Sequence, residues 1–432
     1  MRRSVLAIYL SSFIMPFVAS AVGVALPQMA RGLGEPPVAL MGVLVALTLV
    51  VAVFTLPMGR LSDIVGAGVV FRIGLAVVSA GAVASALAPN VVAVYSAVAL
   101  MGLGLAALFG SNNALLMSLV PPERRASAVG VNSMFVYSGL TLGPLLGGFF
   151  AQVDWRLIFL LAAALAATAF VITEPHERRR GGVGKFDYAG AVLLGASITL
   201  IVIGLTYSSP LLPLGVALLA VTAVVESKSG QPLVEVRLFR NLVFTASVAA
   251  AFLNYLSTAS LTPALSLLFQ ESYGLSPRDA GMVLTAQAVS MAVLAPLAGR
   301  IADKLTPAPV AAAGAALLAA ALFLYSHHID VAPIYLVAMG AGFALFIVPN
   351  TAMILTSAPP NARGVASALV AEARVLGQTI SNAFASLVLR NAPSLATGVS
   401  SLLLVLGYLS VATAALSLLR YFVTPSAPSR GP

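Results

Sequence analysis

Apolar runs follow one another along almost the whole chain, and short groups of glycine, proline or charged residues separate them. A helix needs about 20 apolar residues to cross the hydrocarbon core of a bilayer. The pattern therefore predicts fourteen membrane-spanning helices, at 5–27, 38–58, 69–88, 91–118, 126–152, 155–173, 187–208, 210–226, 241–269, 278–298, 308–326, 331–357, 363–389 and 398–423. The first run is longer than the apolar core of a signal peptide, so we expect a retained span.

The composition fits a lipid solvent. The chain has 432 residues, of which 60% are hydrophobic and 9% charged, whereas soluble domains carry about 25% charged residues. We expect membrane lipids as neighbours. The net charge of +9 does not predict a nucleic-acid partner, because basic residues of membrane proteins gather in cytoplasmic loops. The chain contains no cysteine, which excludes disulfides and thiolate metal sites.

The distribution of lysine and arginine tests the number of spans. With the N-terminus inside, 18 of the 23 basic residues fall in inner loops or tails, Arg420 among them, and 4 fall in outer loops. The remaining one, Arg374, lies within a span. A wrong count would scramble this asymmetry. We therefore expect a multi-pass protein of the plasma membrane with both termini in the cytoplasm.

Two short sequences recur at a fixed distance. GRLSD at 59–63 is followed 240 residues later by GRIAD at 299–303. The triplet ASA at 126–128 and its copy at 366–368 have the same offset. Both copies begin on the inner side, so the pattern predicts a parallel repeat related by an axis along the membrane normal, with the substrate path between the two halves.

The offset exceeds the length of one six-span unit, and an insertion accounts for the excess. We predict an all-α membrane fold of two six-helix bundles plus two inserted helices. The predicted units are an N-terminal bundle at 1–173, an inserted pair with basic cytoplasmic loops at 174–236, and a C-terminal bundle at 237–432.

The loop GRLSDIVGAGVVF at 59–71 and the fifth-span sequence GLTLGPLLGG at 139–148 carry a resemblance that covers the chain. The chain resembles the major facilitator superfamily and is most similar to its fourteen-span drug:proton antiporter branch. All defining positions of the antiporter signature match: Gly139, Gly143, Pro144, Gly147 and Gly148. The resemblance implies alternating access and proton-coupled export of small amphipathic or drug-like molecules.

Three positions depart from that branch. Val18 and Gly23 stand where it carries an aspartate and an asparagine, and Val98 stands where an arginine is usual. The resemblance links those residues to proton coupling. Two alternatives to proton-coupled export therefore stay open. One is an uncoupled facilitator or organic-solute carrier, and the other is a membrane sensor that does not transport.

Glu372 and Arg374 lie nine and eleven residues past Arg363. At about 1.5 Å per residue, both fall near the middle of a core roughly 30 Å thick. They project to nearly opposite sides of the helix. Arg374 shares a face with Gln378 and Asn382, which indicates a cavity wall.

Alignment of the repeats pairs Glu372 with Asn132, and we predict that the two flank a central polar site. Intramembrane ionisable groups are functional by default, so we expect Glu372 to exchange a proton or bind a cation. The alternative is a structural ion pair, with Arg374 or with a polar group of another helix.

Other polar positions support two readings each. Arg60 with Asp63, and Arg300 with Asp303, form either a conformational latch or solvated helix ends. Five amides fall within spans and either line the substrate cavity or bond a neighbouring helix: Asn112, Asn113, Asn254, Gln287 and Asn350. The glycines of the fifth span predict a close contact with another helix. Pro144 is expected to bend the fifth span itself.

Enzyme motifs are not found in the sequence. GGVGK at 181–185 lacks the spacing of a phosphate-binding loop, and neither HExxH nor Gly-x-Ser-x-Gly occurs. We therefore expect no enzymatic activity, no cofactor and no metal, with transport driven by gradients. The expected partner is a small-molecule substrate, accompanied by protons if transport is coupled, and we expect a monomer.

Overall fold

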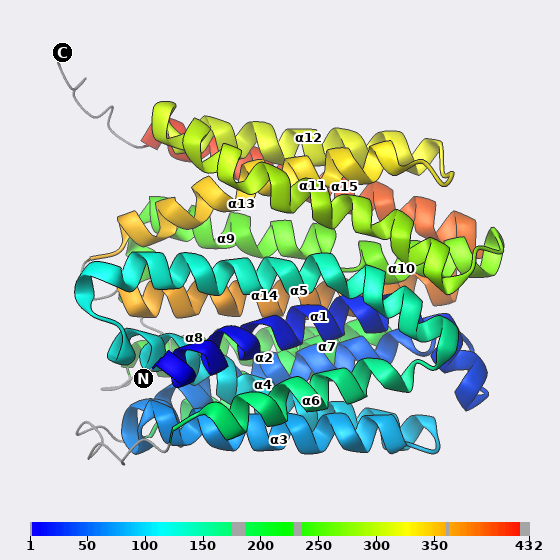
Figure 1. The fold of residues 1–432 in the computed structure, drawn as a ribbon. Helices are drawn as coiled ribbons and strands as arrows, with labels where there is room; N and C mark the ends of the chain where they lie inside the picture. The colour runs from blue at the N-terminus through cyan, green and yellow to red at the C-terminus, as the bar shows by residue number, and fades with distance from the viewer. Residues whose placement is uncertain (1, 175–185, 229–235, 360–362, 424–432) are drawn as a thin grey trace.

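The computed structural model describes residues 2–174, 186–228, 236–359 and 363–423, and these are helical almost throughout. The helices lie side by side with roughly parallel axes (Figure 1). Helix α1 begins and α15 ends at the same end of the bundle. The basic residues Arg178, Arg179, Arg180 and Lys185 of the predicted inserted loop lie outside the described residues.

The first six helices are α1 (Arg2–Leu33), α2 (Met41–Val65), α3 (Ala67–Leu87), α4 (Val91–Leu119), α5 (Arg125–Val153) and α6 (Arg156–Ile172), with the short turn η1 (Pro122–Arg124) before α5. The inserted pair consists of α7 (Tyr188–Thr206) and α8 (Leu211–Lys228). The remaining elements are η2 (Val236–Arg240), α9 (Leu242–Thr258), α10 (Leu261–Leu267), η3 (Leu268–Ser272), α11 (Pro277–Lys304), α12 (Pro307–His327), α13 (Pro333–Ser357), α14 (Arg363–Asn391) and α15 (Leu395–Val423).

All fourteen predicted runs coincide with helical segments of the described chain. Twelve of these segments are long and apolar enough to cross a membrane. Helix α6 is apolar but shorter, and α14 has 29 residues but carries more polar side chains. The chain is therefore an all-helical, multi-pass membrane protein.

The ninth span, predicted as one helix at 241–269, is broken into α9, α10 and the π-helical turn η3. Pro263 cannot donate a backbone hydrogen bond to the preceding turn, which favours a break there. The hydroxyl of Ser381 in α14 bonds two groups of Ser260 at the break, accepting from its amide at 3.1 Å and donating to its hydroxyl at 2.9 Å. Broken helices at membrane depth are tolerated where protein re-satisfies the freed backbone.

The two halves repeat the same packing pattern. Helix α1 packs on α5 and α6, α2 on α4, and α3 on α4 and α6. In the second half, α9 packs on α14 and α15, α11 on α13, and α12 on α13 and α15. The halves meet along two main seams, α5 against α11 and α2 against α14, and α1 also packs on α10. Helix α7 packs on both helices of the second seam. The unit boundaries at residues 173 and 236 stay a prediction.

The fifth-span glycines serve two different contacts. A Cβ atom on Gly139 would lie 2.6 Å from the carbonyl oxygen of Phe13, and one on Gly147 would lie 2.5 Å from the Cα of Ala21, so this face of α5 packs directly on the α1 backbone. On another face, a Cβ on Gly148 would lie 3.1 Å from the Cα of Gly281 in α11. The signature therefore closes both the N-terminal half and one seam, since small residues let helices approach closely in lipid.

A buried arginine ties three helices of the second half together. Arg420, counted above among the inner-loop charges, is only 1% exposed. Its guanidinium donates to Ser247 Oγ at 2.8 Å, to Ser417 Oγ at 2.6 Å and to Asn350 Oδ1. Asn350 Nδ2 in turn donates to the Ser247 carbonyl at 3.0 Å. Asn350 thus bonds its neighbours in α9 and α15, which is the second of the two readings above.

Close packing at Gly147 predicts a steric cost. Gly147→Val should lower the free energy of unfolding by about 1–3 kcal/mol, because the new side chain must push α5 away from α1. Gly130→Val is the matched control in the same helix, since a Cβ there meets nothing within 4 Å. Thermal unfolding in detergent checks both. Equal melting temperatures for the two variants would contradict the packing.

The Arg420 cluster predicts a double-mutant result. Asn350→Leu should cost about 2 kcal/mol of unfolding free energy, because it takes an acceptor from a buried cation. Adding Arg420→Met should recover part of the loss, since the cation needing that acceptor is then gone. The same melting measurement serves here. Strictly additive effects would mean that the two side chains are not coupled.

Candidate functional site

Helix α14 presents its two charged residues to different surroundings. Arg374 is half-buried and its guanidinium carbon lies 5.2 Å above the ring centroid of Phe109 in α4. Tyr255 of α9 lies close enough to Arg374 for the two side chains to interact electrostatically. Tyr255 in turn packs edge-on against Phe343 of α13, with ring centroids 5.7 Å apart. Arg374 therefore bridges the halves, because Phe109 belongs to the first and Tyr255 to the second.

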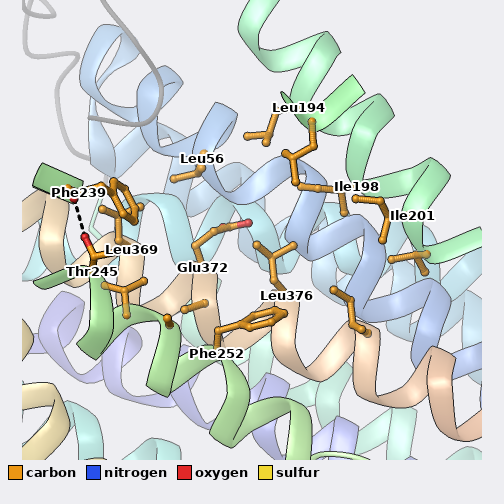
Figure 2. Close-up of a pocket in the computed structure, with 16 residues that line it drawn as sticks. Leu56, Leu194, Ile198, Ile201, Phe239, Thr245, Phe252, Leu369, Glu372 and Leu376 are labelled. Atoms are coloured by element: carbon orange, nitrogen blue, oxygen red, sulfur yellow. Dashed lines mark hydrogen bonds between the residues drawn. The ribbon is translucent and has the colours of Figure 1, made fainter. Parts of the chain in front are cut away.

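Glu372 faces a different space. It lines a cavity of about 380 Å³ between α2, α7, α8, η2, α9 and α14. Figure 2 shows its side chain pointing into this cavity among apolar side chains such as Leu56, Ile198 and Phe252. Glu372 is only 5% exposed, and neither carboxylate oxygen has a hydrogen-bond partner in the described part of the chain. A buried, ionised carboxylate without a partner is costly, which makes Glu372 a candidate site for a proton or a cation.

Asn132 lies in another environment. Its Oδ1 accepts a hydrogen bond from Ser12 Oγ at 2.7 Å, and Ser12 Oγ accepts one from Asn112 Nδ2 at 2.6 Å. This chain of bonds joins α1, α4 and α5 within the first half. The residues lining the Glu372 cavity do not include Asn132, so the structure does not bring the two together. The repeat aligns the two positions along their helices. Their neighbours differ, because the inserted helix α7 packs on α2 and α14, the helices of the second seam.

The other predicted amides divide into bonded and unbonded groups. Asn113 is exposed and donates to Ser367 Oγ at 3.3 Å, from α4 to α14 across the halves. Asn254 is fully buried, and both atoms of its amide lack a partner among the described residues. The side-chain oxygens of Gln378 and Asn382 also have no hydrogen-bond partner among the described residues. Gln287 is half-buried on α11.

The latch residues are placed at helix ends. Arg60 and Asp63 form an ion pair of 3.9 Å within α2, three residues apart. Arg300 and Asp303 are exposed at the end of α11, and no ion pair joins them in the described residues. A bond within one helix fits the reading as a solvated helix end, and a latch between helices stays a prediction.

A polar contact between the halves was not anticipated. Where α1 ends, Arg31 pairs with Glu271 at 2.9 Å and Gln28 Nε2 donates to Gln270 Oε1 at 3.0 Å. Gln270 Nε2 and Ser266 Oγ also donate to the Val24 carbonyl, at 2.8 and 3.1 Å. These bonds, here called the α1–η3 contact, join the first half to the second at one end of the bundle.

The sequence held a signal for this contact. Arg31 and Glu271 are 240 residues apart, the offset of the repeat. Symmetry mates meet only near the pseudo-twofold axis, so opposite charges at that offset could have predicted the pair. The aromatic residues around Arg374 offered no such signal, because Phe109 and Tyr255 are ordinary apolar and aromatic positions within spans.

Comparison with known proteins places this geometry in a family. The family model described as "Major Facilitator Superfamily" matches residues 8–227 and 247–432. "Multidrug resistance protein Stp" of Mycobacterium tuberculosis is 27% identical over 87% of this chain and 74% of its own length. "Uncharacterized transporter YebQ" of Escherichia coli is 28% identical over 92% of this chain and 90% of its own length.

A solved structure has the same fold. The crystal structure of a D-xylose-proton symporter superposes with a TM-score of 0.72, covering 98% of each chain at 16% identity. At that identity the likeness shows the fold alone. The match of the family model to most of the chain decides membership, and the chain belongs to the major facilitator superfamily of membrane transporters; it is a transporter, not an enzyme.

Proposed function

We propose that this protein is a secondary active transporter of the plasma membrane that exports small amphipathic or drug-like molecules in exchange for protons. The observation that carries the proposal is Glu372, a buried carboxylate without a described partner beside the α2–α14 seam. Relatives named for multidrug resistance support the substrate class. Both termini lie in the cytoplasm under this proposal, as the distribution of basic residues favours.

Exchange follows from one carboxylate and two competing occupants. The ionised carboxylate holds a cationic substrate, and a proton that neutralises it removes that attraction. If the halves rock about the seams, the Glu372 cavity changes shape, because Leu56 of the first half and Leu376 of the second both line it. Proton and substrate can then be taken up on opposite sides of the membrane.

The α1–η3 contact serves as one gate in this scheme. It closes one end of the bundle through hydrogen bonds between the halves, among them the Gln270 bond to the Val24 carbonyl at 2.8 Å. Opening that end requires these bonds to break together. Exposed ion pairs such as Arg31 with Glu271 contribute little stability, so the contact is reversible.

An uncoupled facilitator is the second candidate. Val18 and Val98 are both fully buried in the first half, where their apolar side chains pack in the core. No ionisable group stands at either position to take part in coupling. Under this candidate Glu372 serves substrate binding alone, and transport follows the substrate gradient.

The first test measures coupling directly. Purified protein in liposomes with a pH-sensitive dye should release protons when a lipophilic cation is added under a pH gradient. Glu372→Gln should abolish that release, because an amide neither ionises nor carries a proton in exchange. Glu123→Gln, at an exposed carboxylate of η1, is the matched control. Substrate movement that ignores both the gradient and Glu372→Gln would favour the facilitator.

The second test concerns the gate. The chain has no cysteine, so Val24→Cys with Ser266→Cys creates a unique pair across the α1–η3 contact. Cross-linking by oxidation or a short bifunctional thiol reagent should stop transport, and reducing the disulfide should restore it. Each single cysteine variant controls for the substitutions. Full transport by the cross-linked protein would show that this end need not open.

A further inference from the structure

The cavity around Glu372 is partly built by the insertion. Leu194, Ile198, Ile201 and Val202 of α7 and Leu219 of α8 line one side, and η2, α9 and α14 of the second half line another. Helix α7 packs on both α2 and α14. The inserted pair therefore walls a space at the seam between the halves, in addition to extending the bundle.

The walls are apolar apart from two side chains. Of the described lining residues from all six elements, Glu372 is the only one that ionises, and Thr245 is the only other polar one. The Thr245 hydroxyl donates to the Phe239 carbonyl at 2.7 Å (Figure 2), so its proton is already used. Arg374, the next charge along α14, lies over the ring of Phe109 and near Tyr255 instead.

This donor set selects among cations. Hard metal ions need about six oxygen ligands, and the cavity offers one carboxylate and one hydroxyl. An apolar body fits better, because the volume of about 380 Å³ lies within the usual range for small-molecule pockets. The rings of Phe239 and Phe252 also line the cavity, and aromatic faces attract cations. An anion of the same size would meet an unpartnered carboxylate.

One wall of the cavity comes from a helix that is largely exposed. Leu219 of α8 lines the cavity and is 40% exposed. Neighbouring residues of α8, Val216 and Val221, are more than half exposed. An exposed apolar helix of the inserted pair thus forms part of the wall around Glu372.

We propose that the inserted helices α7 and α8 complete a lateral binding site for lipophilic monocations, with Glu372 as the counter-ion and the apolar seam cavity as the receptor for the hydrophobic body. This deepens the proposed function and rests on it only for the exchange of cation against proton. This site is separate from Arg374, whose side chain lies beside Phe109 and Tyr255 on another side of α14.

The experiment measures binding of tetraphenylphosphonium to full-length protein in nanodiscs, with empty nanodiscs as background. Glu372→Gln should weaken binding about tenfold or more, the factor that corresponds to loss of one favourable charge contact. Leu219→Trp should weaken it by filling the cavity from α8. Val221→Trp, on the same helix but not lining the cavity, is the matched control. Ile198→Phe is a second filling variant from α7.

Two further binding measurements separate the effect of charge from that of hydrophobicity. Affinity for tetraphenylphosphonium should rise with pH in the wild type and not in Glu372→Gln, because a proton competes for the same carboxylate. Tetraphenylborate, which has the same shape and the opposite charge, should bind no more weakly to Glu372→Gln than to the wild type.

The outcomes distinguish this inference from the proposed function. Binding unchanged by both filling variants, or lost equally in Val221→Trp, would overturn the lateral site even if Glu372→Gln abolishes proton exchange. Binding that behaves as expected without any proton release in liposomes would support the site and overturn coupled export. Melting temperatures of each variant identify one that fails to fold, and the other filling variant then decides.

Discussion

The bilayer core offers no water, so each polar group within it must find its hydrogen bonds inside the protein. Most hydroxyls in these helices do so locally, as when Ser111 donates to the Ala107 carbonyl at 2.6 Å and Thr379 to that of Val375 at 2.8 Å. Arg420 finds its hydrogen bonds on three side chains, Ser247 of α9, Asn350 of α13 and Ser417 of its own helix α15. The carboxylate of Glu372 departs from that pattern, as the amide of Asn254 does, because neither of its oxygens has a partner among the described residues.

The same constraint shapes how the halves hold together. Lipid gives no hydrophobic drive to helix association, so the seams depend on close backbone approach and on polar contacts. Gly148 and Gly281 bring α5 and α11 together, whereas the second seam has Glu372 and α7 nearby. Arg374 above Phe109 and the α1–η3 contact add attractions that are individually weak. Interfaces of this kind can separate and re-form without unfolding either half.

Sequence reasoning located the helices well, because the length and composition of an apolar run are set by the bilayer itself. It could not locate the break in the ninth span at Ser260, which depends on the hydroxyl of Ser381, 121 residues away. It singled out Glu372, which the structure buries, but paired it with Asn132, since a repeat fixes positions along helices and not which neighbours surround them. The burial of Arg420 was likewise invisible, because its acceptors come from α9 and α13 as well as from α15 itself.

The position of α7 on one seam alone has an evolutionary consequence. A duplicated transporter starts with two equivalent seams, and any change to one is constrained by what both must do. Once α7 covers the α2–α14 seam, substitutions on α7 and α8 can reshape what binds there while the glycine contact of Gly148 with Gly281 keeps the other seam tight. If the cavity at that seam is the binding site, ligand preference and mechanical sealing can change independently, and the inserted pair is where new specificities can arise at least cost to the moving helices.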